Sequence, residues 1–120
     1  MKKSSIIALI VLAILAGFLF YKRGSHYRGK PSMILMSESK FDPEESQIKR
    51  GDTVTFRNVG KSPVWPASNL HPTHGIYPEF DPQHEIKPGE EWSFRFDRVG
   101  AWKYHDHLSP STKGVIEVME

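Results

Sequence analysis

Hydrophobic and polar residues alternate in short stretches over most of the chain after residue 31. Segments 53–58 (TVTFRN) and 92–97 (WSFRFD) show the pattern most clearly. A period of two is typical of strands that bury one face. Turn-forming residues separate these stretches. We expect strands at residues 33–37, 47–50, 53–58, 91–97, 101–107 and 114–119. Several short, regularly spaced strands predict an all-β sandwich or barrel.

One long segment, Lys61–His84, interrupts this pattern because it contains five prolines. We expect it to form no regular element. A loop of this length in a compact domain usually carries function. Its aromatic segments, 65–66 and 77–80, are expected to fold the loop back onto the sandwich.

The N-terminal segment has the composition of a membrane anchor. Lys2 and Lys3 precede an uncharged run at residues 4–21, and Lys22 and Arg23 follow it. As a helix, this run would span about 27 Å of a hydrocarbon core of about 30 Å. No clear small-residue cleavage site follows, which favours an uncleaved anchor over a cleaved signal peptide or a buried core helix.

This pattern divides the chain into an anchor or signal sequence (1–23), a polar linker (24–31) and a domain (32–120). We expect a single pass through the cell membrane, with the C-terminal domain extracytoplasmic (periplasmic in a bacterium). The domain would be secreted if the signal were cleaved.

Charge and cysteine content exclude several classes of function. The chain has no cysteine, which excludes disulfide scaffolds, thiolate metal sites and thiol catalysis. Residues 31–120 hold ten Lys/Arg and fourteen Asp/Glu, a net charge of −4. An acidic domain argues against nucleic acid as a partner.

Two histidine pairs are the main candidates for chemistry. His105 and His107 end a predicted strand, where alternation directs both imidazoles to one face and Tyr104 to the buried face. His71 and His74 lie in the long loop. Together the pairs offer four nitrogens, enough for one metal ion, and neutral imidazole suits copper or zinc. The alternative is a metal-free domain whose histidines only form hydrogen bonds.

Other polar residues near these pairs could orient the ligands. Asp106, His84 and Glu79 are candidates for this role. Asp106 and His84 could instead be structural, and Asp106 could be a direct ligand. Glu79 and Asp81 could be additional ligands, or could be solvated or orient His84 or the backbone.

The order of motifs resembles that of the cupredoxin family. Segments 47–58 (QIKRGDTVTFRN), 86–94 (IKPGEEWSF), 100–104 (GAWKY) and 113–118 (KGVIEV) are similar to strands and turns of plastocyanin-like proteins. The resemblance implies a Greek-key β-sandwich over residues 31–120, with the long loop as an insertion. Where that family has its blue-copper ligands, this chain has Val64, Asp106, Ser109 and Thr112. Ordinary blue-copper electron transfer is therefore not implied.

A second resemblance concerns the histidines. The segment 100–107 (GAWKYHDH) is similar to the H-x-H strand of multicopper oxidases, and 71–74 (HPTH) to part of their histidine loop. It implies copper on His74, His105 and His107, with His71 as a fourth ligand, in a mononuclear site within one chain or between subunits.

These resemblances predict a copper-binding protein for copper handling or redox partnership. Its partners would be the metal ion, the membrane and a redox or copper-donor protein, and a homo-oligomer remains open. The alternatives are a metal-free interaction module and a small type-2-copper enzyme, for which no catalytic residues are evident.

Overall fold

The computed structural model describes residues 7–8, 10–14 and 33–120. Residues 7–8 and 10–14 are helical. No helix in the described ranges is both long and apolar enough to cross a membrane. The rest of the predicted anchor, and the predicted linker, lie outside the described residues.

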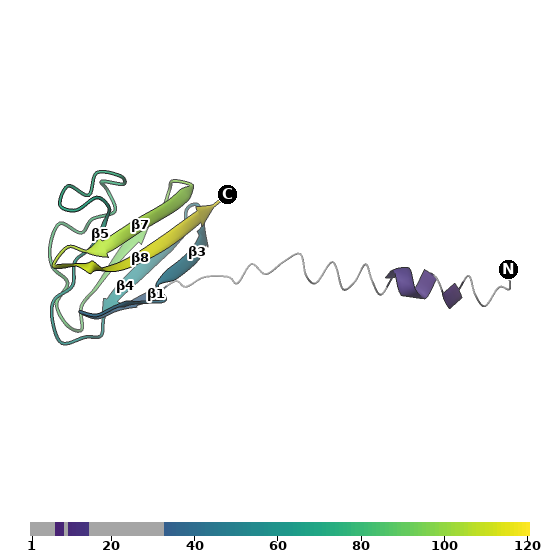
Figure 1. Ribbon diagram of the computed structural model, residues 1–120, viewed down its shortest axis with the longest axis horizontal. Coiled ribbons are helices and arrows are strands. Elements are labelled where there is room, and N and C mark those ends of the chain that lie inside the picture. The colour runs from purple at the N-terminus through teal and green to yellow at the C-terminus, as the bar shows by residue number, and fades with distance from the viewer. Residues whose placement is uncertain (1–6, 9, 15–32) are drawn as a thin grey trace.

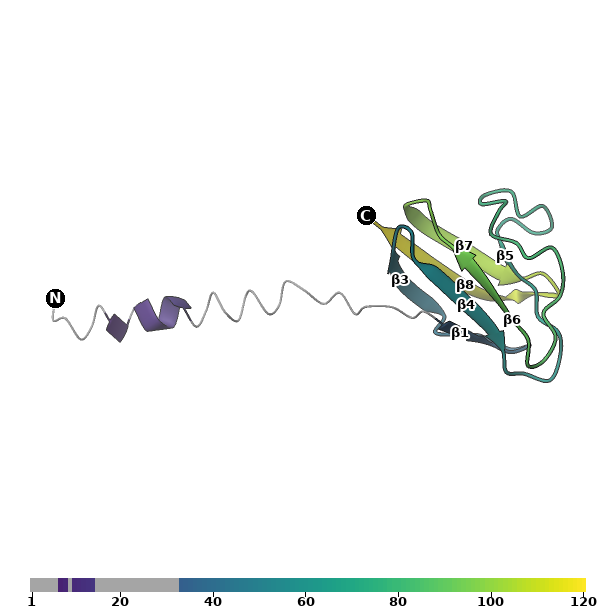
Figure 2. The same ribbon diagram turned by 180° about the vertical axis from the view of Figure 1, so that it is seen from behind.

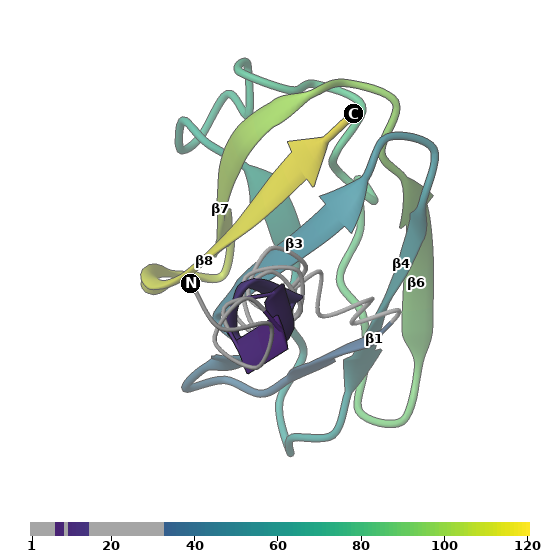
Figure 3. The ribbon, with the colours of Figure 1, turned by 90° about the vertical axis from the view of Figure 1, so that its right-hand side faces the viewer.

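Residues 33–120 fold into two four-stranded sheets that face each other (Figures 1 and 3). The first sheet has the order β2-β1-β4-β6, formed by β1 (Met33–Met36), β2 (Phe41–Asp42), β4 (Thr53–Asn58) and β6 (Glu91–Arg95). The second has the order β3-β8-β7-β5, formed by β3 (Glu45–Lys49), β5 (Pro66–Ser68), β7 (Gly100–Asp106) and β8 (Ser109–Met119). The predicted all-β sandwich is confirmed.

The sheets are mixed. Strand β1 runs parallel to β4, and β3 runs parallel to β8, whereas the other pairs are antiparallel. Parallel neighbours cannot be joined by a tight hairpin, so the chain crosses between the two sheets.

Alternating residues of the strands fill the space between the sheets. In β4 the side chains of Val54, Phe56 and Asn58 are buried, while the intervening residues are partly or fully exposed. Opposite them, Ile48, Ile116 and Val118 are buried from the second sheet. Burying a side chain of this size contributes about 1.5–3 kcal/mol, so the alternation predicted from the sequence fixes which face of each strand turns inward.

Two strands were not predicted. β2 is only two residues long, and β5 lies within the segment expected to form no regular element. The prolines of this segment do not exclude a strand, because Pro66 is the first residue of a short strand at a sheet edge. Proline is tolerated at this position. Strand β8 also begins earlier than expected, at Ser109.

The long loop is attached to the sandwich by two aromatic side chains. Tyr77 and Phe80 are 3% and 0% exposed, and both rings pack against Phe94 and Phe96. The Ser68 N–H donates to the Phe80 carbonyl, which ties the loop to β5. The expected fold-back is confirmed, and the loop lies at the end of the sandwich away from the C-terminus (Figures 1 and 2).

Candidate metal centre

The structure brings the two histidine pairs together. His105 is in β7 and His107 follows directly after it, while His71 and His74 come from the loop after β5. Each imidazole offers one nitrogen to the group, and these four nitrogens lie within 4.8 Å of one another. Residues more than thirty positions apart therefore form one cluster, here called the histidine cluster.

The cluster is buried on one side and open on the other. His105 and His74 are 2% and 5% exposed, whereas His107 is half-buried and His71 is exposed. Tyr104 points into the core, so the side chain of the adjacent His105 projects from the opposite face of β7. His105 is nevertheless buried, because the loop segment carrying Asn69 and His71 covers it.

Two pairs of ring nitrogens face each other inside the cluster. His71 Nδ1 lies 3.2 Å from His105 Nε2, and His74 Nε2 lies 3.0 Å from His107 Nδ1. The outer nitrogens of the two buried rings are already engaged. His105 Nδ1 lies 2.8 Å from Asn69 Oδ1, and His74 Nδ1 lies 2.6 Å from Asp81 Oδ2. If both oxygens accept, Nδ1 carries the proton and Nε2 presents its lone pair to the cluster.

The spacing of the facing nitrogens fits a shared ion. With metal–nitrogen bonds of about 2.0–2.1 Å, donors in a tetrahedron stand about 3.3 Å apart, and donors in a square plane stand about 2.9 Å and 4.1 Å apart. The separations of 3.0 and 3.2 Å fall in this range. The natural donor atoms are therefore Nε2 of His74 and His105, and Nδ1 of His71 and His107.

The electrostatics favour the neutral form of two of the rings, His105 and His107. Burial, together with the neighbouring His74, His71 and His107, lowers the pKa of His105 to about 4. Burial and the neighbouring rings also lower the pKa of His107. Because only neutral imidazole binds a metal, both rings are in the binding form at neutral pH.

Asp81 connects the loop to two parts of the cluster. Burial opposes ionisation of its carboxyl, but hydrogen bonds from His74, the Gln83 N–H and the Trp65 indole hold its pKa below the usual value. The Trp65 ring also packs against the His107 ring at a centroid distance of 4.6 Å. One carboxylate thus fixes His74 directly and His107 through Trp65.

The three residues expected to orient the ligands have other contacts. Asp106 is 1% exposed, and its Oδ1 accepts hydrogen bonds from the Trp65 and Leu108 N–H groups, which is the structural role. Glu79 pairs with Arg98 on the surface. His84 is exposed and its Nδ1 bonds the Pro82 carbonyl. In the described structure, the orienting contacts come instead from Asp81 and Asn69.

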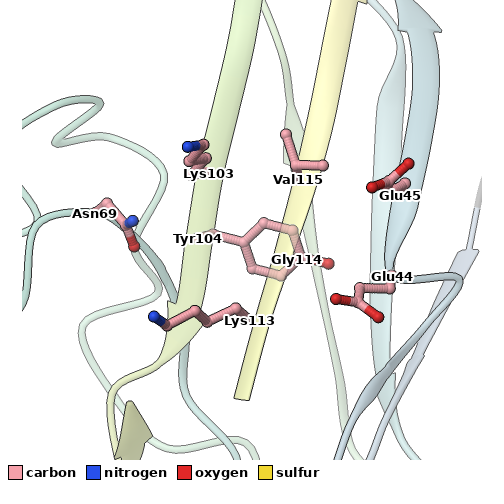
Figure 4. Close-up of a pocket in the computed structure, with 8 residues that line it drawn as sticks. All are labelled: Glu44, Glu45, Asn69, Lys103, Tyr104, Lys113, Gly114 and Val115. Atoms are coloured by element: carbon pink, nitrogen blue, oxygen red, sulfur yellow. The ribbon is translucent and has the colours of Figure 1, made fainter. Parts of the chain in front are cut away.

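A separate hollow of about 330 Å³ lies over β7 and β8, beside Glu44 and Glu45 (Figure 4). Lys103, Lys113 and Asn69 lie on one side and the two glutamates on the other, with Tyr104 and Gly114 between them. Asn69 is shared with the histidine cluster through its contact with His105. The mixed charges of this hollow indicate no particular ligand.

Comparisons with known proteins agree on the type of domain. No family model matches the chain. A candidate pseudoazurin of Rhizobium leguminosarum bv. viciae is 32% identical over 80 residues, which cover 65% of this chain. The chain spans about half the length of that curated relative, 49%.

Solved structures show the same fold. A reduced amicyanin variant matches with a TM-score of 0.62 at 24% identity, covering 72% of this chain and 79% of that one. A purple cupredoxin from Nitrosopumilus maritimus matches at 0.58 and 19%, covering 72% and 97%. A copper-containing nitrite reductase from Thermus scotoductus matches at 0.61 and 22%, covering 76% of this chain but 23% of the reductase. The part of the chain that carries the histidine cluster therefore has the fold of these copper proteins, a cupredoxin-like β-sandwich.

Proposed function

We propose that the chain binds one copper ion through His71, His74, His105 and His107, and that it acts in copper handling or as a redox partner of another protein. The observation that carries this proposal is the convergence of four ring nitrogens within 4.8 Å. Two of these rings, His74 and His105, are buried, and their Nδ1 atoms contact Asp81 and Asn69. Imidazoles fixed in this way are suitable ligands for copper.

The relatives support copper as the ion. An amicyanin variant has been solved in a Cu(I) form, and the nitrite reductase contains copper. The binding site proposed here differs from a blue-copper centre because the chain has no cysteine thiolate. Copper bound by imidazoles alone should lack an intense thiolate-to-copper absorption band. Zinc is the alternative ion for the same donor set.

The exposure of His71 supports exchange with a partner. His71 is exposed and His107 is half-buried, so these two rings form the edge of the cluster that is open to solvent. A copper donor or a redox protein would therefore reach the ion at this edge. Copper transfer and electron transfer both need such access. An assay of copper transfer and an assay of electron transfer would therefore distinguish the two roles.

We further propose that the domain works outside the cytoplasm, attached to the cell membrane by residues 1–23. The support is the uncharged run at residues 4–21 between basic flanks. Protease added to intact cells or spheroplasts should digest the domain while the N-terminal segment stays with the membrane fraction. Protection of the domain until the cells are lysed would contradict this location.

Copper titration of the full chain tests the binding. We expect one Cu(II) per chain, with nitrogen hyperfine structure in the EPR spectrum. His105→Ala should abolish tight binding, because this ring is the most buried of the four. His84→Ala is the matched control, since His84 is exposed and outside the cluster. Equal binding by wild type and His105→Ala, or no binding by wild type, would refute the site.

A further inference from the structure

The two oxygens of Asp81 have different partners. Oδ1 accepts a hydrogen bond from the Trp65 indole at 2.8 Å and another from the Gln83 N–H at 2.8 Å. Among residues 33–120, Oδ2 has one hydrogen-bond partner, His74 Nδ1, at 2.6 Å. The carboxyl group is therefore held in one orientation by two donors, with its second oxygen directed at a ring of the histidine cluster.

We propose that Asp81 is a positioning residue that fixes the proton of His74 on Nδ1 and so leaves the Nε2 lone pair free for the metal ion. This inference rests on the proposed function. A carboxylate can only accept hydrogen bonds, so a contact of 2.6 Å requires the ring nitrogen to donate. In neutral imidazole, protonation of Nδ1 leaves Nε2 as the acceptor.

The arrangement makes an unusual prediction for the near-isosteric variant Asp81→Asn. The two N–H donors from Trp65 and Gln83 still require an oxygen at the Oδ1 position. The amide nitrogen must then occupy the Oδ2 position and donate to His74 Nδ1. The ring can accept this bond only by moving its proton to Nε2, the atom that would bind the ion.

The altered tautomer of His74 in Asp81→Asn should also change the tautomer of His107. His74 Nε2 lies 3.0 Å from His107 Nδ1, so in the metal-free protein His107 donates to His74. Binding of the ion to His107 Nδ1 then requires this proton to move to Nε2 of the same ring, which is half-buried and can exchange the proton with water. Once Nε2 of His74 carries a proton, the direction of this bond reverses. His107 then carries its own proton on Nε2. A single amide in place of a carboxylate thus changes the tautomers of two cluster histidines.

The test has two readouts on the full chain. Long-range ¹H–¹⁵N NMR of the metal-free protein should place the His74 proton on Nδ1 in wild type and on Nε2 in Asp81→Asn. Competition with a chelator should show Cu(II) affinity at least tenfold lower in Asp81→Asn, in line with the 10–100-fold cost of losing a ligand's partner. Glu79→Gln is the control, because Glu79 pairs with exposed Arg98 on the surface and is not part of the histidine cluster.

A third variant separates positioning from simple structural support. Asp81→Ala leaves His74 free to exchange its tautomer, so it should bind Cu(II) more tightly than Asp81→Asn does. A merely structural role predicts the reverse order, since Asn preserves more of the packing. Unchanged His74 tautomer in Asp81→Asn, or the reversed order of affinities, would overturn the inference. Absence of copper binding in wild type would instead overturn the proposed function, and the NMR result would still decide the tautomer.

Discussion

Replacing Phe80 with alanine should destabilise both the sandwich and the histidine cluster. The Phe80 side chain is fully buried, and the Phe80 backbone carbonyl accepts a hydrogen bond from the Ser68 N–H at 2.9 Å. The ring has centroid distances of 4.9–6.1 Å to five aromatic rings, those of Phe56, Trp92, Phe94, Phe96 and Tyr104. It is therefore the main attachment between the long loop and the core.

The expected loss of stability in Phe80→Ala follows from this environment. Truncation of a buried phenylalanine to alanine costs about 3–5 kcal/mol through lost burial and the cavity left behind. The five neighbouring rings come from both sheets, so the cavity cannot close without moving the core. Domains of this size have total stabilities of about 5–15 kcal/mol. We therefore expect Phe80→Ala to lose a large share of its stability, with weaker copper binding because Asp81 is the next residue.

Urea denaturation, followed by tryptophan fluorescence, measures the free energy of unfolding of the full chain. Val59→Ala is the control, since Val59 is an apolar loop residue that is 57% exposed, and surface changes usually stay within about 0.5 kcal/mol. Copper titration of both variants measures the effect on the cluster. A loss below about 1 kcal/mol in Phe80→Ala would refute the reasoning that this ring anchors the loop.

Four further predictions concern the core, pH and the ion. The Tyr104 hydroxyl is buried without a hydrogen-bond partner in the described structure, so Tyr104→Phe should raise the free energy of unfolding by about 1 kcal/mol. Gly114→Ala should lower the free energy of unfolding by about 1–3 kcal/mol, because the new Cβ would lie 2.5 Å from the Tyr104 ring. Urea titrations measure both changes. The metal-free protein should lose stability as pH falls from 6.5 to about 4, because unfolded His105 takes up a proton there and the folded residue does not; a flat stability–pH profile would contradict this. Copper at 100 times its dissociation constant should add about 2.7 kcal/mol of stability, seen as a higher melting temperature that His105→Ala lacks.

The alternation of residues was enough to predict most of the strands, because one face of each strand is buried by the opposite sheet. Residues 53–58 were predicted at their observed bounds. The strand β5 was not predicted, because it begins at Pro66 in a segment with five prolines. At a sheet edge the missing N–H of proline costs little, and position within the sheet cannot be read from a single segment.

The four cluster histidines were also identified from the sequence, because each pair is local and its chemistry is evident from residue type. The residues that orient them were not. Asn69 contacts His105 across 36 positions, and Trp65 contacts Asp81 across 16. Such contacts depend on how the loop folds over β7, which no local pattern specifies. The nearby Asp106 and Glu79 were better candidates by proximity in sequence alone.

A crystal structure of the copper-loaded chain, with anomalous data at the copper edge, would show whether the four imidazoles hold one ion. We predict a single peak about 2 Å from Nδ1 of His71 and His107 and from Nε2 of His74 and His105, a distance typical of metal–imidazole bonds. A cluster without a peak after loading, or with the four rings turned apart around it, would contradict the account.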